Sequence, residues 1–144
     1  MKISFDLDDT IIVNNSFECE QQTLMQRIFG VERIRLGTIA LFKELKAKGH
    51  SICVYTTSYR SVGKIRFMFC SYGISIDEII NQIIHEKKVR SVNMPMSKYP
   101  PAFGIDIHID DSIGVGMEGE RYGFKTIIVS VDDNDWVNSI MKQI

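Results

Sequence analysis

The chain has few cysteines, no excess of charge of one sign and no long apolar run. Cys19, Cys53 and Cys70 are widely spaced and form no C-x-x-C pair, so the usual patterns of a zinc site or a redox dithiol are missing. Its 17 basic and 18 acidic residues give a formal net charge of −1, without the basic excess that favours nucleic acid. No apolar run approaches the ~20 residues of a membrane span, and the first residues lack a signal-peptide pattern. We therefore expect a cytoplasmic protein with reduced cysteines, no membrane partner and no evidence for nucleic acid as a partner.

Length and periodicity predict one domain over residues 1–144. A chain of 144 residues is close to the commonest domain size. Apolar strand-like segments alternate with helical patterns, which favours an α/β, Rossmann-like three-layer fold with a central parallel sheet and helices on both faces. We expect strands at 3–7, 51–55, 105–109 and 126–131, a short one at 83–84, and helices at 16–29, 38–48, 61–72, 77–82, 115–122 and from about 135.

Two stretches between these elements are unusual. The interval 14–37 leaves room for a small helical insertion, its helix opened by Asn14, Asn15 or Ser16 and closed by Gly30. The interval 83–101 predicts a long loop, and long loops in compact domains are often functional. For Cys53 and Cys70 we expect places in the core, as small apolar side chains.

The first acidic motif is Asp6-Leu7-Asp8-Asp9-Thr10, directly behind an apolar strand. Ligands of open parallel sheets bind outside the carboxyl ends of the strands, and residues two apart on an extended chain point to the same side. Asp6 and Asp8 can therefore face one site. Paired carboxylates raise one pKa unless a cation intervenes, and Mg²⁺ prefers oxygen ligands. An ordinary turn or helix cap would also use these residue types.

Two further polar clusters follow strand-like segments. Thr56-Thr57-Ser58 comes after 51–55, and Asp110-Asp111 comes after 105–109. Each alone is compatible with a helix cap. A cap does not explain why a second carboxylate pair ends a strand as the first one does.

Four motifs in this order and setting resemble those of the haloacid dehalogenase superfamily, and the likeness spans the whole chain. The resemblance implies a Rossmann-like fold and Mg²⁺-dependent phosphoryl transfer through an aspartyl-phosphate, in a capless or minimally capped member. The matching elements are Asp6-x-Asp8-x-Thr10, Thr56-Thr57-Ser58, Lys98 and Asp110-Asp111.

The first motif carries the chemistry that the resemblance implies. Asp6 matches the nucleophile, and Asp8 matches the general acid/base, whose backbone carbonyl also binds metal in many members. Thr10 matches a supporting hydroxyl. Different environments can give two nearby carboxyl groups these separate roles.

The second and third motifs match phosphate-binding groups. Thr56 is preferred to Thr57 as the hydroxyl that binds a phosphoryl oxygen. Lys98 matches the cation that offsets charge on the nucleophile and the phosphoryl group. Lys87 and Lys88 are the alternatives to Lys98.

The fourth motif completes a metal set of Asp6, Asp8, Asp110 and Asp111. We expect Asp111 to be a direct ligand and Asp110 to act through water or to orient the lysine. Ser58, Arg60 and Ser112 lie beside the motifs and either contact substrate or are ordinary caps and surface groups. His108 shares a strand face with Asp106 and Asp110, and a polar strand face partly open to solvent would explain it as well.

The function implied is a phosphohydrolase acting on a phosphomonoester whose identity and size the sequence does not specify. A phosphotransferase would use the same residues, and a catalytically silent binding module is the non-enzyme alternative. A dehalogenase fits the metal-binding acids poorly, and a two-component receiver domain has its acidic pair and phosphoacceptor in another order. Short intervals between motifs predict an open site, suited to a macromolecular substrate or to a lid from a second subunit, which leaves a homo-oligomer open.

Overall fold

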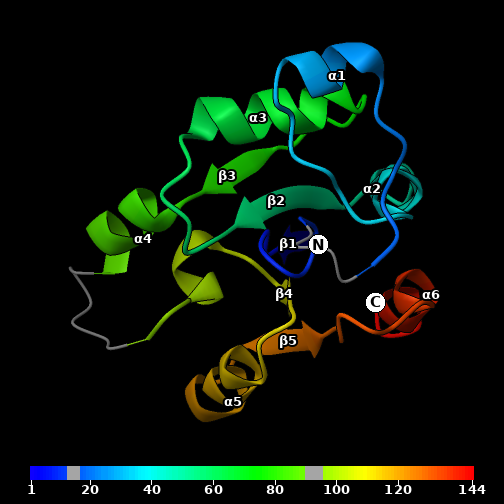
Figure 1. Cartoon of the computed structure of the whole chain (residues 1–144). Coiled ribbons are helices and arrows are strands. Elements are labelled where there is room, and N and C mark those ends of the chain that lie inside the picture. The colour runs from blue at the N-terminus through cyan, green and yellow to red at the C-terminus, as the bar shows by residue number, and fades with distance from the viewer. Residues whose placement is uncertain (13–16, 90–95) are drawn as a thin grey trace.

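A computed structural model describes residues 1–12, 17–89 and 96–144. Five parallel strands form one sheet in the order β3-β2-β1-β4-β5 (Figure 1). The first strand lies at the centre, and the chain winds outward from it in both directions. The strands are β1 (Lys2–Phe5), β2 (Ser51–Tyr55), β3 (Glu78–Ile80), β4 (Ile107–Asp110) and β5 (Lys125–Ile128).

Helices cover both faces of the sheet, as predicted. α2, α3 and α6 bury apolar residues in the main core on one face. On the other face α4 and a 3₁₀ helix, η2, enclose a smaller cluster, and α5 packs along β5. The helices are α1 (Leu24–Ile28), α2 (Thr38–Ala47), α3 (Val62–Ser71), α4 (Gln82–Val89), η2 (Pro100–Phe103), α5 (Ile113–Tyr122) and α6 (Trp136–Met141).

Three aromatic rings tie β1 to the helices of the main core. The rings of Phe5 and Phe42 have centroids 4.5 Å apart, and those of Phe42 and Phe69 are 5.9 Å apart. All three side chains are almost fully buried. Burial of these rings holds β1 against α2 and α3, and so positions the loop that follows β1. The α/β three-layer fold predicted from the sequence is confirmed.

At two short segments the structure has a strand where a helix was predicted, or a helix where a strand was predicted. Residues 78–80 form strand β3 rather than part of a helix, and Val54 of β2 pairs with Ile79. Residues 83–84 lie in helix α4 rather than a strand, and the side chain of Asn81 accepts a hydrogen bond from the amide of Ile84. Short apolar runs do not distinguish helix from strand, so tertiary pairing decided both.

The helix expected at 16–29 is limited to α1. Thr23 and Gln26 form a capping box at its start, and the expected caps at 14–16 lie outside the described residues. The backbone amide of Glu20 donates a hydrogen bond to the carbonyl oxygen of Ile34, and that of Leu36 donates to the carbonyl oxygen of Glu18. The segment before α1 is therefore extended. Pairing with the returning chain outweighs its helical pattern.

Other expectations for this part of the chain are also corrected. Much of the loop expected at 83–101 is helical, in α4 and η2. Cys53 is buried as predicted, whereas Cys70 is exposed because it lies on the outward side of α3. Within the described ranges, no helix has the length and apolar character needed to cross a membrane.

Candidate active site

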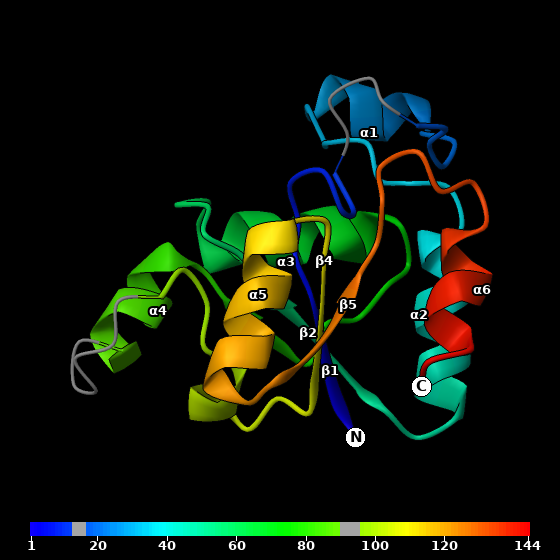
Figure 2. The ribbon, with the colours of Figure 1, turned by 90° about the horizontal axis from the view of Figure 1, so that it is seen from below.

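The candidate site lies at the carboxyl edge of the sheet, beneath the segment that carries α1 (Figure 2). Asp6 follows β1 directly, and its amide donates to the carbonyl oxygen of Ile109 at 2.9 Å. Asp110 ends the neighbouring strand β4. Parallel pairing of β1 with β4 therefore brings the two predicted acidic motifs together.

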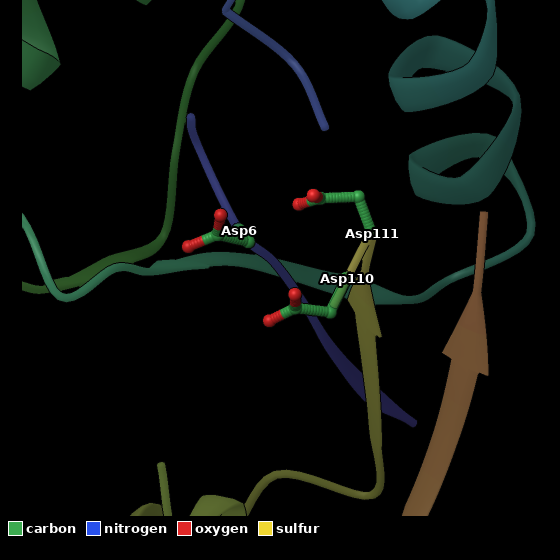
Figure 3. Close-up of side chains that lie close together, drawn as sticks. All are labelled: Asp6, Asp110 and Asp111. Atoms are coloured by element: carbon green, nitrogen blue, oxygen red, sulfur yellow. The ribbon is translucent and has the colours of Figure 1, made fainter. Parts of the chain in front are cut away.

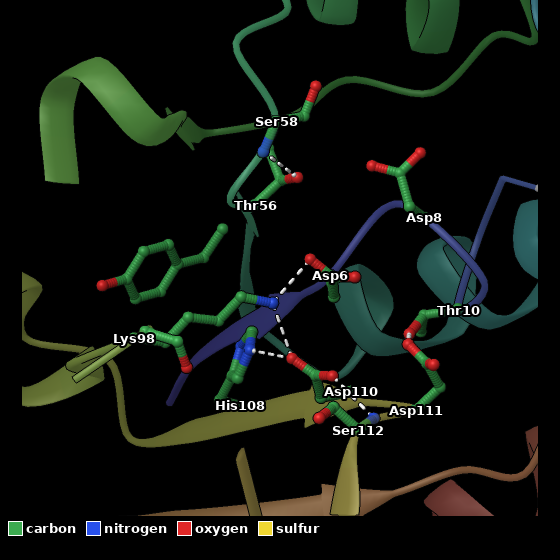
Figure 4. A network of polar contacts seen from close by, with 12 residues as sticks. Asp6, Asp8, Thr10, Thr56, Ser58, Lys98, His108, Asp110, Asp111 and Ser112 are labelled. Carbon is green, nitrogen blue, oxygen red and sulfur yellow. Dashed lines mark hydrogen bonds and ion pairs between the residues drawn. The ribbon is translucent and has the colours of Figure 1, made fainter. Parts of the chain in front are cut away.

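Lys98 joins these two motifs. Its Nζ lies 2.5 Å from Oδ1 of Asp6 and 2.6 Å from Oδ2 of Asp110 (Figure 4). The lysine is only 3% exposed, in contrast to Lys87 and Lys88, which lie on the exposed side of α4. Of the three lysines weighed from the sequence, Lys98 is thus the one at the carboxylates.

Asp111 points into the same space from the end of β4 (Figure 3). Carboxylate oxygens of Asp6, Asp110 and Asp111 lie within 4.8 Å of one another. Thr10 donates a hydrogen bond of 2.9 Å to Oδ1 of Asp111, so the hydroxyl of the first motif supports the fourth. Three convergent carboxylates form a donor set suited to a hard divalent cation.

Burial and charge give these carboxyl groups different pKa values. Burial raises the pKa of Asp6 to about 7, and the charge of Asp110 adds to this effect, while Lys98 opposes it. For Asp110, burial is outweighed by the hydrogen bond from His108 and the charge of Lys98, which hold its pKa well below the usual range. The pKa of Asp111 is raised, by burial and then by Asp110. A bound divalent cation would favour the ionised form of all three.

His108 and Ser4 form a buried series of hydrogen bonds that ends at Asp110. Nε2 of His108 lies 2.9 Å from Oδ2 of Asp110, and Nδ1 lies 2.8 Å from the hydroxyl of Ser4. Burial lowers the pKa of His108 to about 4, so the ring is neutral at pH 7. Since the ionised Asp110 only accepts, Nε2 donates to it and Nδ1 accepts from Ser4.

The second motif lies at the end of β2, beside Asp6. Thr56 is buried, and its Oγ1 accepts a hydrogen bond of 3.0 Å from the amide of Ser58. Because that bond uses only a lone pair, the hydroxyl proton of Thr56 remains available to an acceptor in the site. Thr57 is exposed.

The carboxylate of Asp8 extends toward Ser58 and does not point the same way as that of Asp6 (Figure 4). This corrects the expectation from an extended chain, because β1 ends at Phe5 and the backbone turns after it. Asp8 precedes Asp9, whose φ of 61° makes it the one non-glycine residue with a positive φ in the described ranges. The backbone amides of Ile11 and Ile12 both donate hydrogen bonds to the carbonyl oxygen of Leu7, which closes this turn. Oδ2 of Asp8 accepts a hydrogen bond of 2.9 Å from Arg60.

The segment that carries Lys98 is held by a second buried network. The hydroxyl of Tyr55 accepts a hydrogen bond of 2.8 Å from the amide of Tyr99 and lies 2.5 Å from Nδ1 of His85. Both Tyr55 and His85 are buried. The lysine backbone is thereby attached to β2 and α4, which limits where its ammonium group can reach.

Several of these supporting residues were not identified from the sequence. His108 is fully buried rather than on a partly open strand face, and Ser4 pairs with it in the register of β1 and β4. The available signal was a polar residue two positions before each acidic motif, namely Ser4 before Asp6 and His108 before Asp110. His85 carried no signal in the sequence, because its partner Tyr55 is distant along the chain.

Comparisons with solved structures identify the fold. A haloacid dehalogenase superfamily hydrolase of subfamily IA, variant 1, from Geobacter sulfurreducens superposes with a TM-score of 0.62 at 11% identity, covering 99% of this chain and 98% of that one. A mutant CbbY from Rhodobacter sphaeroides, in complex with xylulose-(1,5)bisphosphate, gives a TM-score of 0.53 at 14% identity, covering 90% and 85%.

A third solved structure, a predicted haloacid dehalogenase-like hydrolase from Porphyromonas gingivalis, gives a TM-score of 0.52 at 12% identity over 99% of this chain and 96% of that one. No family model matches the chain, and neither does any curated protein sequence. The chain therefore has the fold of the haloacid dehalogenase superfamily, as the resemblance implied.

Proposed function

We propose that this protein is a Mg²⁺-dependent phosphohydrolase that acts on a phosphomonoester through an aspartyl-phosphate. The observation that carries the proposal is the position of Lys98 between Asp6 and Asp110 at the carboxyl edge of a haloacid dehalogenase fold. A lysine bridging two buried carboxylates can offset the charge of an attacking carboxylate and of a transferring phosphoryl group.

The residues of the site fit a magnesium ion. Oδ2 of Asp110 accepts from Lys98 and His108, and its Oδ1 accepts from the amide of Ser112 at 2.8 Å. Thr10 is the one other residue in the described ranges that donates a hydrogen bond to Asp111, and it does so at Oδ1, so Oδ2 can face a cation. This difference supports Asp111 as the direct ligand and Asp110 as the group that orients Lys98.

The other proposed ligands are Asp6 and the backbone carbonyl of Asp8. When bound, Mg²⁺ would offset negative charge at the reacting phosphoryl group.

Each protein group then has a defined task. Oδ2 of Asp6, whose Oδ1 faces Lys98, forms a bond to phosphorus while the ester P–O bond breaks and Asp8 gives a proton to the departing alcohol. The hydroxyl of Thr56 donates to a phosphoryl oxygen. Asp8 next takes a proton from a water molecule that attacks phosphorus, which releases phosphate and restores Asp6. The 44% exposed side chain of Asp8 favours water as the acceptor.

A screen for phosphatase activity tests the proposal. The purified chain is incubated with Mg²⁺ and with phosphosugars, nucleotides, phosphopeptides and nucleic-acid ends, and released phosphate is measured. Phosphosugars come first, because one structural neighbour was solved with a sugar bisphosphate. Activity that requires Mg²⁺ and is lost in Asp6→Asn is the expected result. No release from any class would contradict the proposed function.

A further inference from the structure

Arg60 connects three separate segments at the mouth of the site. It lies in the loop between β2 and α3, and its Nη1 is 2.9 Å from Oδ2 of Asp8 and 2.9 Å from the hydroxyl of Ser58. Its Nη2 is 2.7 Å from Oε1 of Glu32, and its Nε is 2.9 Å from Oε2 of the same carboxylate. Glu32 comes from the segment that carries α1. One guanidinium thus links the first motif, the second motif and the insertion.

The position of Arg60 is fixed at both ends of the residue. Its carbonyl oxygen accepts a hydrogen bond of 3.0 Å from Asn81, and its amide donates to Ser58 at 3.1 Å. The hydrogen bonds with Glu32 and then Asp8 raise the pKa of Arg60, so it stays charged. An isolated surface ion pair contributes little, whereas a two-point contact with a carboxylate imposes a definite orientation.

The contact leaves the two oxygens of Asp8 in different situations. Oδ2 accepts from Arg60, while Oδ1 has no hydrogen-bond partner within the described ranges. A carboxyl group anchored by one oxygen can present the other to a reacting atom. Lys98 holds Asp6 and Arg60 holds Asp8, so each of the two predicted catalytic carboxylates has its own cation.

We propose that Arg60 is the positioning residue of Asp8, and that Glu32 of the insertion holds Arg60 in the orientation this requires. This inference rests on the proposed function, since it concerns the residue assigned there to proton transfer. The insertion then contributes to the transfer of the proton to the leaving group.

The quality of the leaving group separates this role from a merely structural one. A nitrophenolate departs without a proton, whereas an alkoxide needs a general acid. Displacement of Asp8 therefore slows an alkyl phosphate far more than p-nitrophenyl phosphate. General loss of structure would slow both to the same extent.

The experiment measures kcat/KM with Mg²⁺ for p-nitrophenyl phosphate and for glycerol 1-phosphate. We expect Arg60→Gln to lower the value for the alkyl ester by about 10²-fold and that for the aryl ester by less than about threefold. Glu32→Gln should show the same selectivity with a smaller loss. For Arg60→Lys, kcat/KM on the alkyl ester should lie between the values of wild type and Arg60→Gln, because an ammonium group cannot contact Glu32 at two points.

The matched control is Arg66→Gln on α3, where the guanidinium donates to the carbonyl of Ile76. It should leave the ratio of the two values unchanged. Thermal melting shows which variants are folded, and Arg60→Lys and Glu32→Gln test the inference if Arg60→Gln does not fold.

Equal losses on both esters would overturn the role of Arg60 while leaving the phosphohydrolase intact. A wild-type chain inactive on both esters and in the wider screen would reject the proposed function, and the inference with it.

Discussion

The ammonium nitrogen of Lys98 lies 2.5 Å from Oδ1 of Asp6, although 92 residues separate them in the chain. Both side chains are buried, and burial raises the pKa of Asp6 to about 7. A carboxylate must be ionised to attack phosphorus, so the neighbouring cation and a bound metal ion would both favour the reactive form.

Replacement of Asp6, the proposed nucleophile, should abolish turnover without unfolding the protein. Asp6→Asn preserves the shape of the side chain and a neutral partner for Lys98, but an amide cannot form the phosphoenzyme. Steady-state kinetics measures the loss, and circular dichroism monitors the fold. Activity within about tenfold of wild type would be incompatible with covalent catalysis.

Removal of Asp111 should weaken Mg²⁺ binding more than removal of Asp110. Among the other residues of the described ranges only Thr10 donates to Asp111, at Oδ1, whereas both oxygens of Asp110 accept hydrogen bonds from neighbouring residues. Isothermal titration calorimetry of Asp111→Ala and Asp110→Ala with Mg²⁺ measures the difference. Equal losses, or the reverse order, would show that the assignment is wrong.

Small generic phosphoesters should be poor substrates for the isolated monomer. The short intervals between the motifs predict an open site, which would exclude water poorly and gain little from closure around the substrate. α1 exposes Leu24, Met25 and Ile28, which a large substrate or a second subunit could cover. The values of kcat/KM should be compared with the oligomeric state measured by analytical ultracentrifugation. High efficiency on one small phosphometabolite by a monomer would contradict the prediction.

Protonation of His85 should contribute to loss of stability in mild acid. Burial lowers its pKa from 6.5 in the folded protein, so the unfolded chain binds the additional proton as the pH falls below about 6.5. The stabilising effect of the neutral ring is present above that pH and is lost below it. Urea unfolding from pH 7.5 to 5 should therefore show a shallower decline for His85→Gln than for wild type.

His50→Gln is the control for that measurement, because His50 lies outside the buried network of Tyr55. Identical slopes for His85→Gln and wild type would count against a neutral, buried His85.

Two glycines of α5 should respond in opposite ways to alanine. A Cβ on Gly119 would lie 2.8 Å from the carbonyl oxygen of Phe124, which the backbone cannot easily move. Gly119→Ala should therefore cost about 1–3 kcal/mol of unfolding free energy. Gly114→Ala meets only the hydroxyl of Ser112 at 3.4 Å and should add about 0.4–1 kcal/mol. Urea titration measures the change in unfolding free energy for each variant. Changes of the same sign in the two variants would contradict the prediction.

The sequence by itself determined the central sheet and the convergence of its acidic motifs. The apolar segments before Asp6, Thr56 and Asp110 predicted buried parallel strands, and the carboxyl ends of such strands meet at one edge. The choice of Lys98 over Lys87 and Lys88 came from the family resemblance. The structure places the ammonium group of Lys98 between two buried carboxylates.

Only the tertiary structure decided the features that depend on distant partners. The exchange of helix and strand at 78–89 follows from parallel pairing with β2, and the short length of α1 follows from pairing with the returning chain. The burial of His108 and the contact of Glu32 with Arg60 have the same origin. Local patterns report the period of a segment and its caps, whereas these contacts depend on which surfaces meet once the segments are packed.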